Sequence, residues 1–111
     1  MLNAPLGSCL VAFVSIRGDA VWDGEYARHV ATLDELIQDQ PGYLDMTSVR
    51  DPVTRHGITI AVFTDEASAR AWKGVAEHRL AQEFGRQRGY ADYHVVITQV
   101  QRSYGHVGKP R

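Results

Sequence analysis

Side chains that could take part in chemistry gather between Trp72 and Tyr93, in the second half of a chain of 111 residues. Trp72 offers a broad apolar wall and one N–H donor, which suits the lining of a pocket. His78 carries the side chain that titrates near neutral pH without help, so it is a candidate acid-base group. The structural alternatives are that Trp72 lies in the core and that His78 is solvated or lies at a subunit contact. The stretch therefore predicts either a site or a helix that only covers a sheet.

No sequence pattern for metal or nucleophilic chemistry accompanies these residues. Cys9 is the single cysteine, so it has no partner for a disulfide or a metal-binding pair, and the five histidines are scattered over different predicted elements. There is no phosphate-binding glycine loop and no nucleophile motif. We therefore expect no bound metal, flavin or haem, and the single cysteine favours a reducing cytoplasm.

Composition and charge narrow the classes of partner. Twelve basic and thirteen acidic side chains give a net charge of -1, which lacks the positive field that binding to nucleic-acid phosphates needs. The chain is 44% hydrophobic, as in one globular domain, and no run is long and apolar enough to span a membrane. We expect one domain over residues 8–104, flexible termini at 1–7 and 105–111, and neither nucleic-acid nor membrane partners.

Strand and helix patterns alternate along this domain. Apolar and β-branched residues predict strands at 8–17, 43–50, 57–64 and 91–104. Apolar residues at spacings of three and four predict helices over 22–38 and 64–88, and Gly74 is expected to break or kink the second helix. The order βαββαβ, with right-handed crossovers, places both helices on one face of an antiparallel sheet. The predicted fold class is α+β, with the ferredoxin-like arrangement.

Both faces of this predicted sheet are apolar. In the first strand, Val11 and Phe13 alternate with Ala12 and Val14, and the third strand repeats the pattern around Ile60. One layer of helices covers one face, and a large exposed apolar face is a liability in a monomer. A second copy packed sheet against sheet removes that liability. We therefore expect a homodimer.

The order of the elements and three stretches together resemble the antibiotic biosynthesis monooxygenase domain family, small proteins of the dimeric α/β-barrel fold. The stretches are QPGYL at 40–44, FTDEASARAW at 63–72 and the segment 76–104. In that family the sheets of two subunits pack together, and each subunit keeps a pocket between its own sheet and helices. Some members oxidise aromatic or quinol compounds with molecular oxygen and without metal or flavin.

The resemblance implies a cofactor-independent monooxygenase that acts with O2 on a small aromatic or quinone-like compound. Trp72 matches the helix tryptophan often found in the family's pocket, and His78 is kept as the acid-base candidate. Such a pocket must be apolar, with a few donors that stabilise an aromatic oxyanion. The candidates for these donors and for the pocket lining are Tyr26, Tyr43, Arg50, Tyr90 and Tyr93.

Three other functions are alternatives to this one. The first is a protein of the same fold that binds a small ligand, or an accessory subunit, without turnover. The second is the haem-degrading branch of the family, whose first-strand asparagine and haem-ligating histidine are both missing here. The third is RNA binding, because RNA recognition domains share the element order. Those domains carry stacking aromatics where the third strand here has Ile58 and Ile60.

Overall fold

The computed structural model describes residues 2–88 and 90–108, and for residues 81–88, 90 and 91 it describes the backbone alone. The elements follow the predicted βαββαβ order with one short 3-10 helix, η1, before the first α-helix. They are β1 (Cys9–Arg17), η1 (Ala20–Trp22), α1 (Asp23–Gln38), β2 (Tyr43–Arg50), β3 (His56–Phe63), α2 (Glu66–Arg88) and β4 (Tyr90–Gln99).

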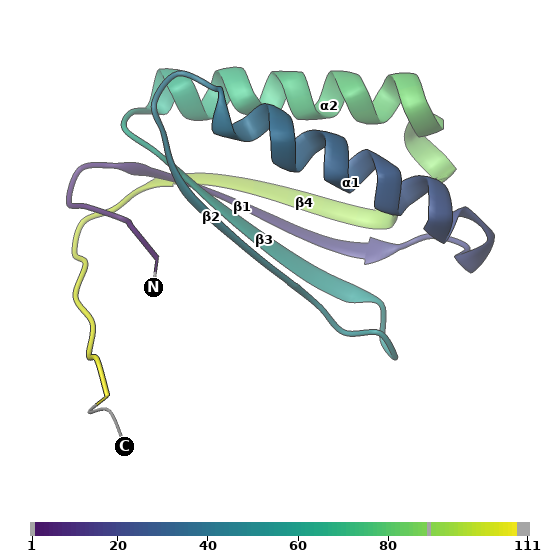
Figure 1. Ribbon diagram of the computed structural model, residues 1–111, viewed down its shortest axis with the longest axis horizontal. Helices are drawn as coiled ribbons and strands as arrows, with labels where there is room; N and C mark the ends of the chain where they lie inside the picture. Colours follow the sequence, from purple (N-terminus) through teal and green to yellow (C-terminus); the bar gives the residue numbers. More distant parts are fainter. Residues whose placement is uncertain (1, 89, 109–111) are drawn as a thin grey trace.

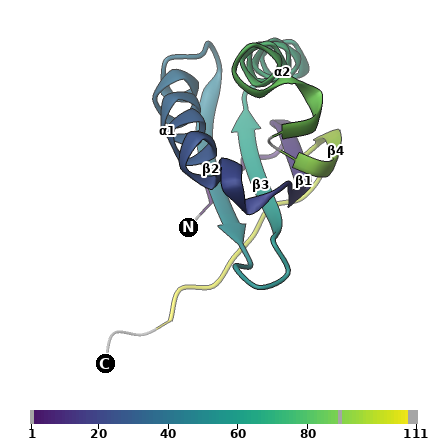
Figure 2. The ribbon, with the colours of Figure 1, turned by 90° about the vertical axis from the view of Figure 1, so that its right-hand side faces the viewer.

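The four strands form one antiparallel sheet in the order β2-β3-β1-β4. Both helices lie on the same face of this sheet (Figure 1), and the end-on view shows α1 and α2 side by side above it (Figure 2). β1 runs through the middle, where Val11 lies opposite Ala61 of β3 and Ile97 of β4. The ferredoxin-like fold that the sequence predicts is confirmed.

The core fills the space between the helices and the sheet. Alternate strand residues point into it, because side chains alternate between the two faces of a sheet. Val11, Ala61 and Phe63 pack there against Ile37 of α1 and Ala69 of α2, and all five are buried. These contacts fix the height of both helices above β1 and β3.

The second helix, α2, runs without a break through Gly74, so the expected break there is wrong. A glycine costs a helix interior only about 0.5–1 kcal/mol relative to alanine, which the rest of a long helix offsets. Its start is capped by Asp65, since Ser68 N–H donates to Asp65 Oδ1 at 2.7 Å. Because the helix continues, Trp72 and Ala76, four positions apart, lie on the same face.

The last strand, β4, ends at Gln99 and does not reach residue 104 as predicted. Gln99 lies opposite Cys9, the first residue of β1, so the chain beyond it has no neighbouring strand with which to pair. Val100 instead bonds to the segment before β1: its N–H donates to Ser8 O at 2.8 Å, and its carbonyl accepts from Gly7 N–H at 2.9 Å. Within the described part of the chain, no helix combines the length and apolar character needed to cross a bilayer.

We call the sheet face opposite the helices the open face (Figure 1). The strand side chains that do not point toward the helices lie on it, because side chains alternate along a strand. Four of them, Val14, Val49, Ile58 and Val96, are 43% to 69% exposed. Ile58 lies opposite both Val14 and Val49 in the strand register. The single chain therefore presents a contiguous row of apolar side chains to solvent.

Candidate functional site

A cavity of about 370 Å³ lies between the two helices and the sheet. The volume is in the range of small-molecule sites. Helix α1 lines it with Tyr26, His29, Val30, Leu33 and Asp34. Helix α2 lines it with Trp72, Lys73, Ala76, Glu77 and Leu80. The floor is the sheet, whose apolar lining residues include Val11, Phe13, Met46 and Val95.

Trp72 belongs to both the core and the cavity wall. Its side chain is 7% exposed and packs in the same cluster as Phe63 and Ile37, and it also lines the cavity. Trp72 is therefore both a core residue and a lining residue of the cavity, the two interpretations that the sequence left open. One part of the indole supports the sheet, and another part is available to a bound molecule.

His29 is a residue of this cavity that the sequence did not single out as a site candidate. The side chain is 1% exposed and lines the cavity, with its ring centroid 6.5 Å from that of Tyr26. A histidine ring nitrogen can accept or donate a proton, so an imidazole beside an apolar cavity is equipped for acid-base chemistry. The signal was in the sequence, because His29 falls on the apolar face of the predicted helix, but that pattern does not separate core from cavity.

Two of the predicted site residues, His78 and Tyr43, are not among the described lining residues of the cavity. His78 is exposed on α2 and is not among the described lining residues. Tyr43 packs edge-on against Phe63, with ring centroids 6.2 Å apart, and burial, followed by the nearby Asp45 carboxylate, raises the pKa of Tyr43. The side chain of Tyr90 lies outside the described residues. The cavity gathers Trp72, Tyr26, Arg50 and Tyr93 from the predicted set.

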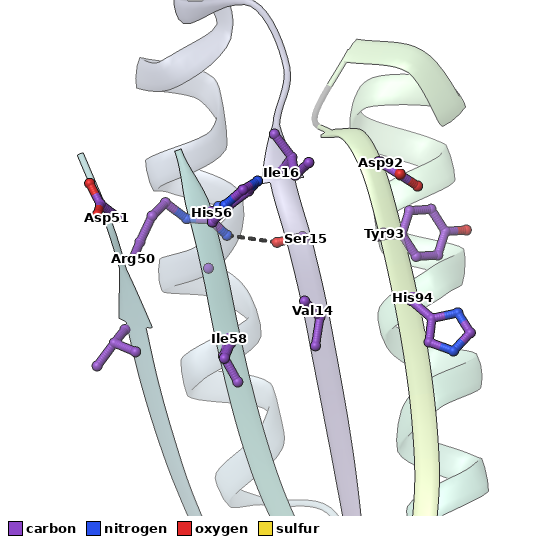
Figure 3. A pocket seen from close by; sticks show the side chains of 12 residues that line it. Val14, Ser15, Ile16, Arg50, Asp51, His56, Ile58, Asp92, Tyr93 and His94 are labelled. Atoms are coloured by element: carbon purple, nitrogen blue, oxygen red, sulfur yellow. Dashed lines mark hydrogen bonds between the residues drawn. The ribbon is translucent and has the colours of Figure 1, made fainter. Parts of the chain in front are cut away.

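The polar end of the cavity is built around Arg50, the last residue of β2. Its guanidinium donates to Arg55 O at 2.7 Å, to Ser15 Oγ at 2.9 Å and to Tyr26 OH at 3.3 Å. The side chain reaches from β2 across β3 toward Ser15 on β1 (Figure 3). Gly57 of β3 lies opposite Arg50, and a Cβ at position 57 would be 2.5 Å from Arg50 Cζ. The missing side chain at Gly57 is what leaves room for the guanidinium.

Two further arginines stand beside this group, and we call Arg17, Arg50 and Arg55 the arginine cluster. Arg17 is 8% exposed, with its Cζ 3.3 Å from the centroid of the Tyr26 ring and Nη2 2.9 Å from Asp23 Oδ1. Arg55 donates to both oxygens of Asp23, at 2.8 and 3.1 Å. Burial lowers the pKa of Arg17, and the hydrogen bond from Arg55 lowers the pKa of Asp23. One carboxylate is thus shared by two of the three cations.

Arg50 also borders a more open depression of about 600 Å³, whose rim includes open-face residues (Figure 3). Its rim carries His56, Asp92 and His94, and Tyr93 lines both hollows. The ring of Tyr93 stacks on Phe13 at 5.5 Å between centroids. Among the residues that the structure describes, no three His, Cys, Asp or Glu side chains are placed to hold a metal ion.

Comparison with known proteins gives the family. The model of the antibiotic biosynthesis monooxygenases matches residues 9–84. The uncharacterised protein YqjZ of Bacillus subtilis is 33% identical over 92 residues, which cover 83% of this chain and 78% of that protein.

Solved structures share the fold at lower identity. A variant of SnoaB, a cofactor-independent oxygenase from Streptomyces nogalater, gives a TM-score of 0.65 at 15% identity, over 92% of this chain and 100% of that one. A dimeric ferredoxin-like protein of unknown function from Thermobifida fusca gives 0.63 at 15% identity, over 90% and 97%. At such identities the likeness shows the fold alone. The match over residues 9–84 shows that the chain belongs to the antibiotic biosynthesis monooxygenase family.

Proposed function

We propose that the cavity beside Trp72 binds a flat aromatic or quinone-like molecule and that the protein oxygenates it with molecular oxygen, without a bound cofactor. The observation that carries the proposal is the cavity itself, about 370 Å³ between helices and sheet, with the buried Trp72 in its wall. An aromatic wall favours a flat ligand, since stacked rings attract beyond their buried area. Family membership and the oxygenase activity named for SnoaB support the reaction class.

The reaction that fits this proposal converts an activated CH2 group of the ligand to a ketone. The carbon loses two hydrogen atoms and gains one oxygen atom of O2, and the other oxygen atom leaves as water with those hydrogens. The substrate supplies all of the electrons that O2 takes up, so no separate reductant is needed. Removal of a proton comes first, because the delocalised carbanion that results is the species able to give an electron to oxygen.

In this proposal His29 takes that proton. It is the histidine among the described lining residues, and it is 1% exposed on the same cavity as Trp72. A general base has to come within hydrogen-bonding reach of the proton that it removes, and a lining position satisfies that requirement. His78, the candidate from the sequence, remains the alternative base, and the two histidines are tested side by side.

The proposal is tested with an oxygen electrode on a panel of anthrones, quinols and flavonoids. Trp72→Phe should lower ligand affinity or oxygen uptake several-fold while keeping the melting temperature near that of the wild type. The matched control, Ile37→Val, removes one methylene from a fully buried core residue and should cost about 0.5–1.5 kcal/mol of stability with its chemistry intact. His29→Gln should abolish turnover, and His78→Ala should not.

The outcomes separate the candidate functions. Binding of panel compounds without oxygen uptake would support the second candidate, a ligand-binding or accessory protein that uses the same cavity. If no compound binds and Trp72→Phe changes only the melting temperature, the site is a packed helix over a sheet and the proposal is wrong.

We also propose that the protein is a homodimer joined through the open face. The support is the row of exposed apolar residues, Val14, Val49, Ile58 and Val96, together with the dimeric state named for the Thermobifida fusca protein. A reducing cytoplasm remains our proposed location, on the ground of the single buried Cys9.

A further inference from the structure

We infer that the ligand of this cavity carries an acidic group, either a carboxylate or an ionised enol or phenol oxygen, and that Arg50 binds that group. The inference rests on the proposed function, because it names a property of the molecule that occupies the same cavity. Its ground is the arginine cluster, whose charges do not balance within the described residues.

Among the described residues, Arg50 is the cation of the cluster for which no carboxylate partner is found. Asp23 is shared by Arg17 and Arg55. In the part of the chain that the structure describes, no Asp or Glu oxygen lies within ion-pair distance of Arg50, whose hydrogen bonds go to neutral acceptors. A half-buried guanidinium is stabilised when an anion accompanies it. A ligand with an acidic oxygen would supply that anion.

The geometry around Arg50 suits a binding group that is fixed in advance. The neutral acceptors come from separate elements: Ser15 from β1, Tyr26 from α1, and Arg55 from the turn before β3. These bonds use three of the five N–H donors of a guanidinium, which leaves donors for an acceptor in the cavity. A planar, held guanidinium is matched to the oxygens of a carboxylate or an enolate.

The alternative is that Arg50 only ties strands together. It bridges β2, β1 and α1 across Gly57, and such a tie would also be lost in an Arg50 variant. A tie affects stability but does not discriminate between an acid and a neutral molecule of the same shape. The decisive quantity is therefore the ratio of affinities within a matched pair of ligands.

The test uses isothermal titration calorimetry on the full chain with two matched pairs of probes. Naphthoate is compared with naphthamide, which tests a carboxylate, and hydroxynaphthoquinone with methoxynaphthoquinone, which tests an ionised enol. In the wild type we expect the acidic member of at least one pair to bind about 10- to 100-fold more tightly, the worth of one charge-assisted contact. The pair that shows the preference identifies the chemical source of the acidic oxygen.

Three variants assign the preference to Arg50. Arg50→Gln should remove the preference, because the acidic member loses far more affinity than the neutral one. Gly57→Ala keeps the charge but places a Cβ 2.5 Å from Arg50 Cζ and 2.6 Å from Nη2, so it should push the guanidinium away and weaken the preference too. Arg70→Gln removes a positive charge from an exposed i,i+4 pair on α2 and should leave the preference intact.

The possible results distinguish a failure of the acid-group inference from a failure of the proposed function. If neutral and acidic members bind equally well to the wild type, the acid-group inference is wrong while the aromatic cavity stands. The inference is equally wrong if Arg50→Gln and Gly57→Ala both fold and keep the preference. If neither member of either pair binds, the proposed function fails and the inference falls with it. Should Arg50→Gln not fold, Gly57→Ala alone decides, because the three described atoms nearest to its new Cβ all belong to the guanidinium of Arg50.

Discussion

Placing a charge in the middle of the open face should separate the assembly of the protein from its folding. The perturbation is Val14→Lys on β1, one of the two inner strands of the sheet. In the single subunit Val14 is 44% exposed, and a lysine there can turn its ammonium group toward solvent. Folding of the subunit should therefore change by no more than about 0.5–1 kcal/mol.

The same lysine is far more costly if two open faces pack together. It would then be desolvated without a partner, which costs about 3 kcal/mol or more. A two-fold axis introduces the change twice, so the dimer loses about 6 kcal/mol, and its dissociation constant rises about 10⁴-fold. At micromolar concentration a dimer of ordinary affinity would become a folded monomer.

Sedimentation equilibrium at several protein concentrations, with circular dichroism for the fold, measures both effects. Val53→Lys is the matched control, because Val53 is 88% exposed in the turn between β2 and β3, outside the row of apolar residues. The control should remain a dimer. A wild-type protein that sediments at 12.4 kDa, or a Val14→Lys protein that stays dimeric, would refute the assignment of the open face.

Three further outcomes follow from features of the chain. Gly74→Ala on α2 should raise the melting temperature by a few degrees in differential scanning calorimetry, because alanine is favoured by about 0.5–1 kcal/mol in a helix interior and a Cβ there meets nothing within 4 Å. The hydrogen bond from Arg55 lowers the pKa of Asp23 from 3.8, so the ionised carboxylate stabilises the fold at higher pH. Urea unfolding should therefore show wild type as more stable than Asp23→Asn near neutral pH, and this difference in stability should disappear as the pH falls below about 4. Purified protein should show no haem or flavin absorbance and no stoichiometric metal. A Soret absorbance band would instead support the haem-degrading alternative.

The fold was predictable from the sequence because its signals are local. Val11 and Phe13 alternate with Ala12 and Val14, and this period of two assigns each side chain of β1 to the helix side or the open face whatever its partners are. The end of β4 was not predictable in this way. It depends on where β1 begins, at Cys9, and that is a property of the register between strands that are distant in the sequence.

The candidate site was only partly predictable for the same physical reason. Trp72 and Arg50 could be named from their residue types and the family resemblance. Their surroundings could not, because Ser15, Tyr26 and Gly57 meet Arg50 from three other elements. His29 shows a further limit, since a helical period places it on the inner face but does not tell whether that face meets a packed core or an empty cavity.

The bare backbone at Gly57 links two positions that must change together over evolutionary time. The register places residue 50 opposite residue 57. The guanidinium of Arg50 occupies the space that a Cβ at position 57 would need. A relative with arginine at position 50 should therefore have glycine at position 57. A relative with a side chain at position 57 should have a shorter residue at position 50. Alignments of this family should therefore show these two columns covarying, and should sort its members by whether their ligands are acidic.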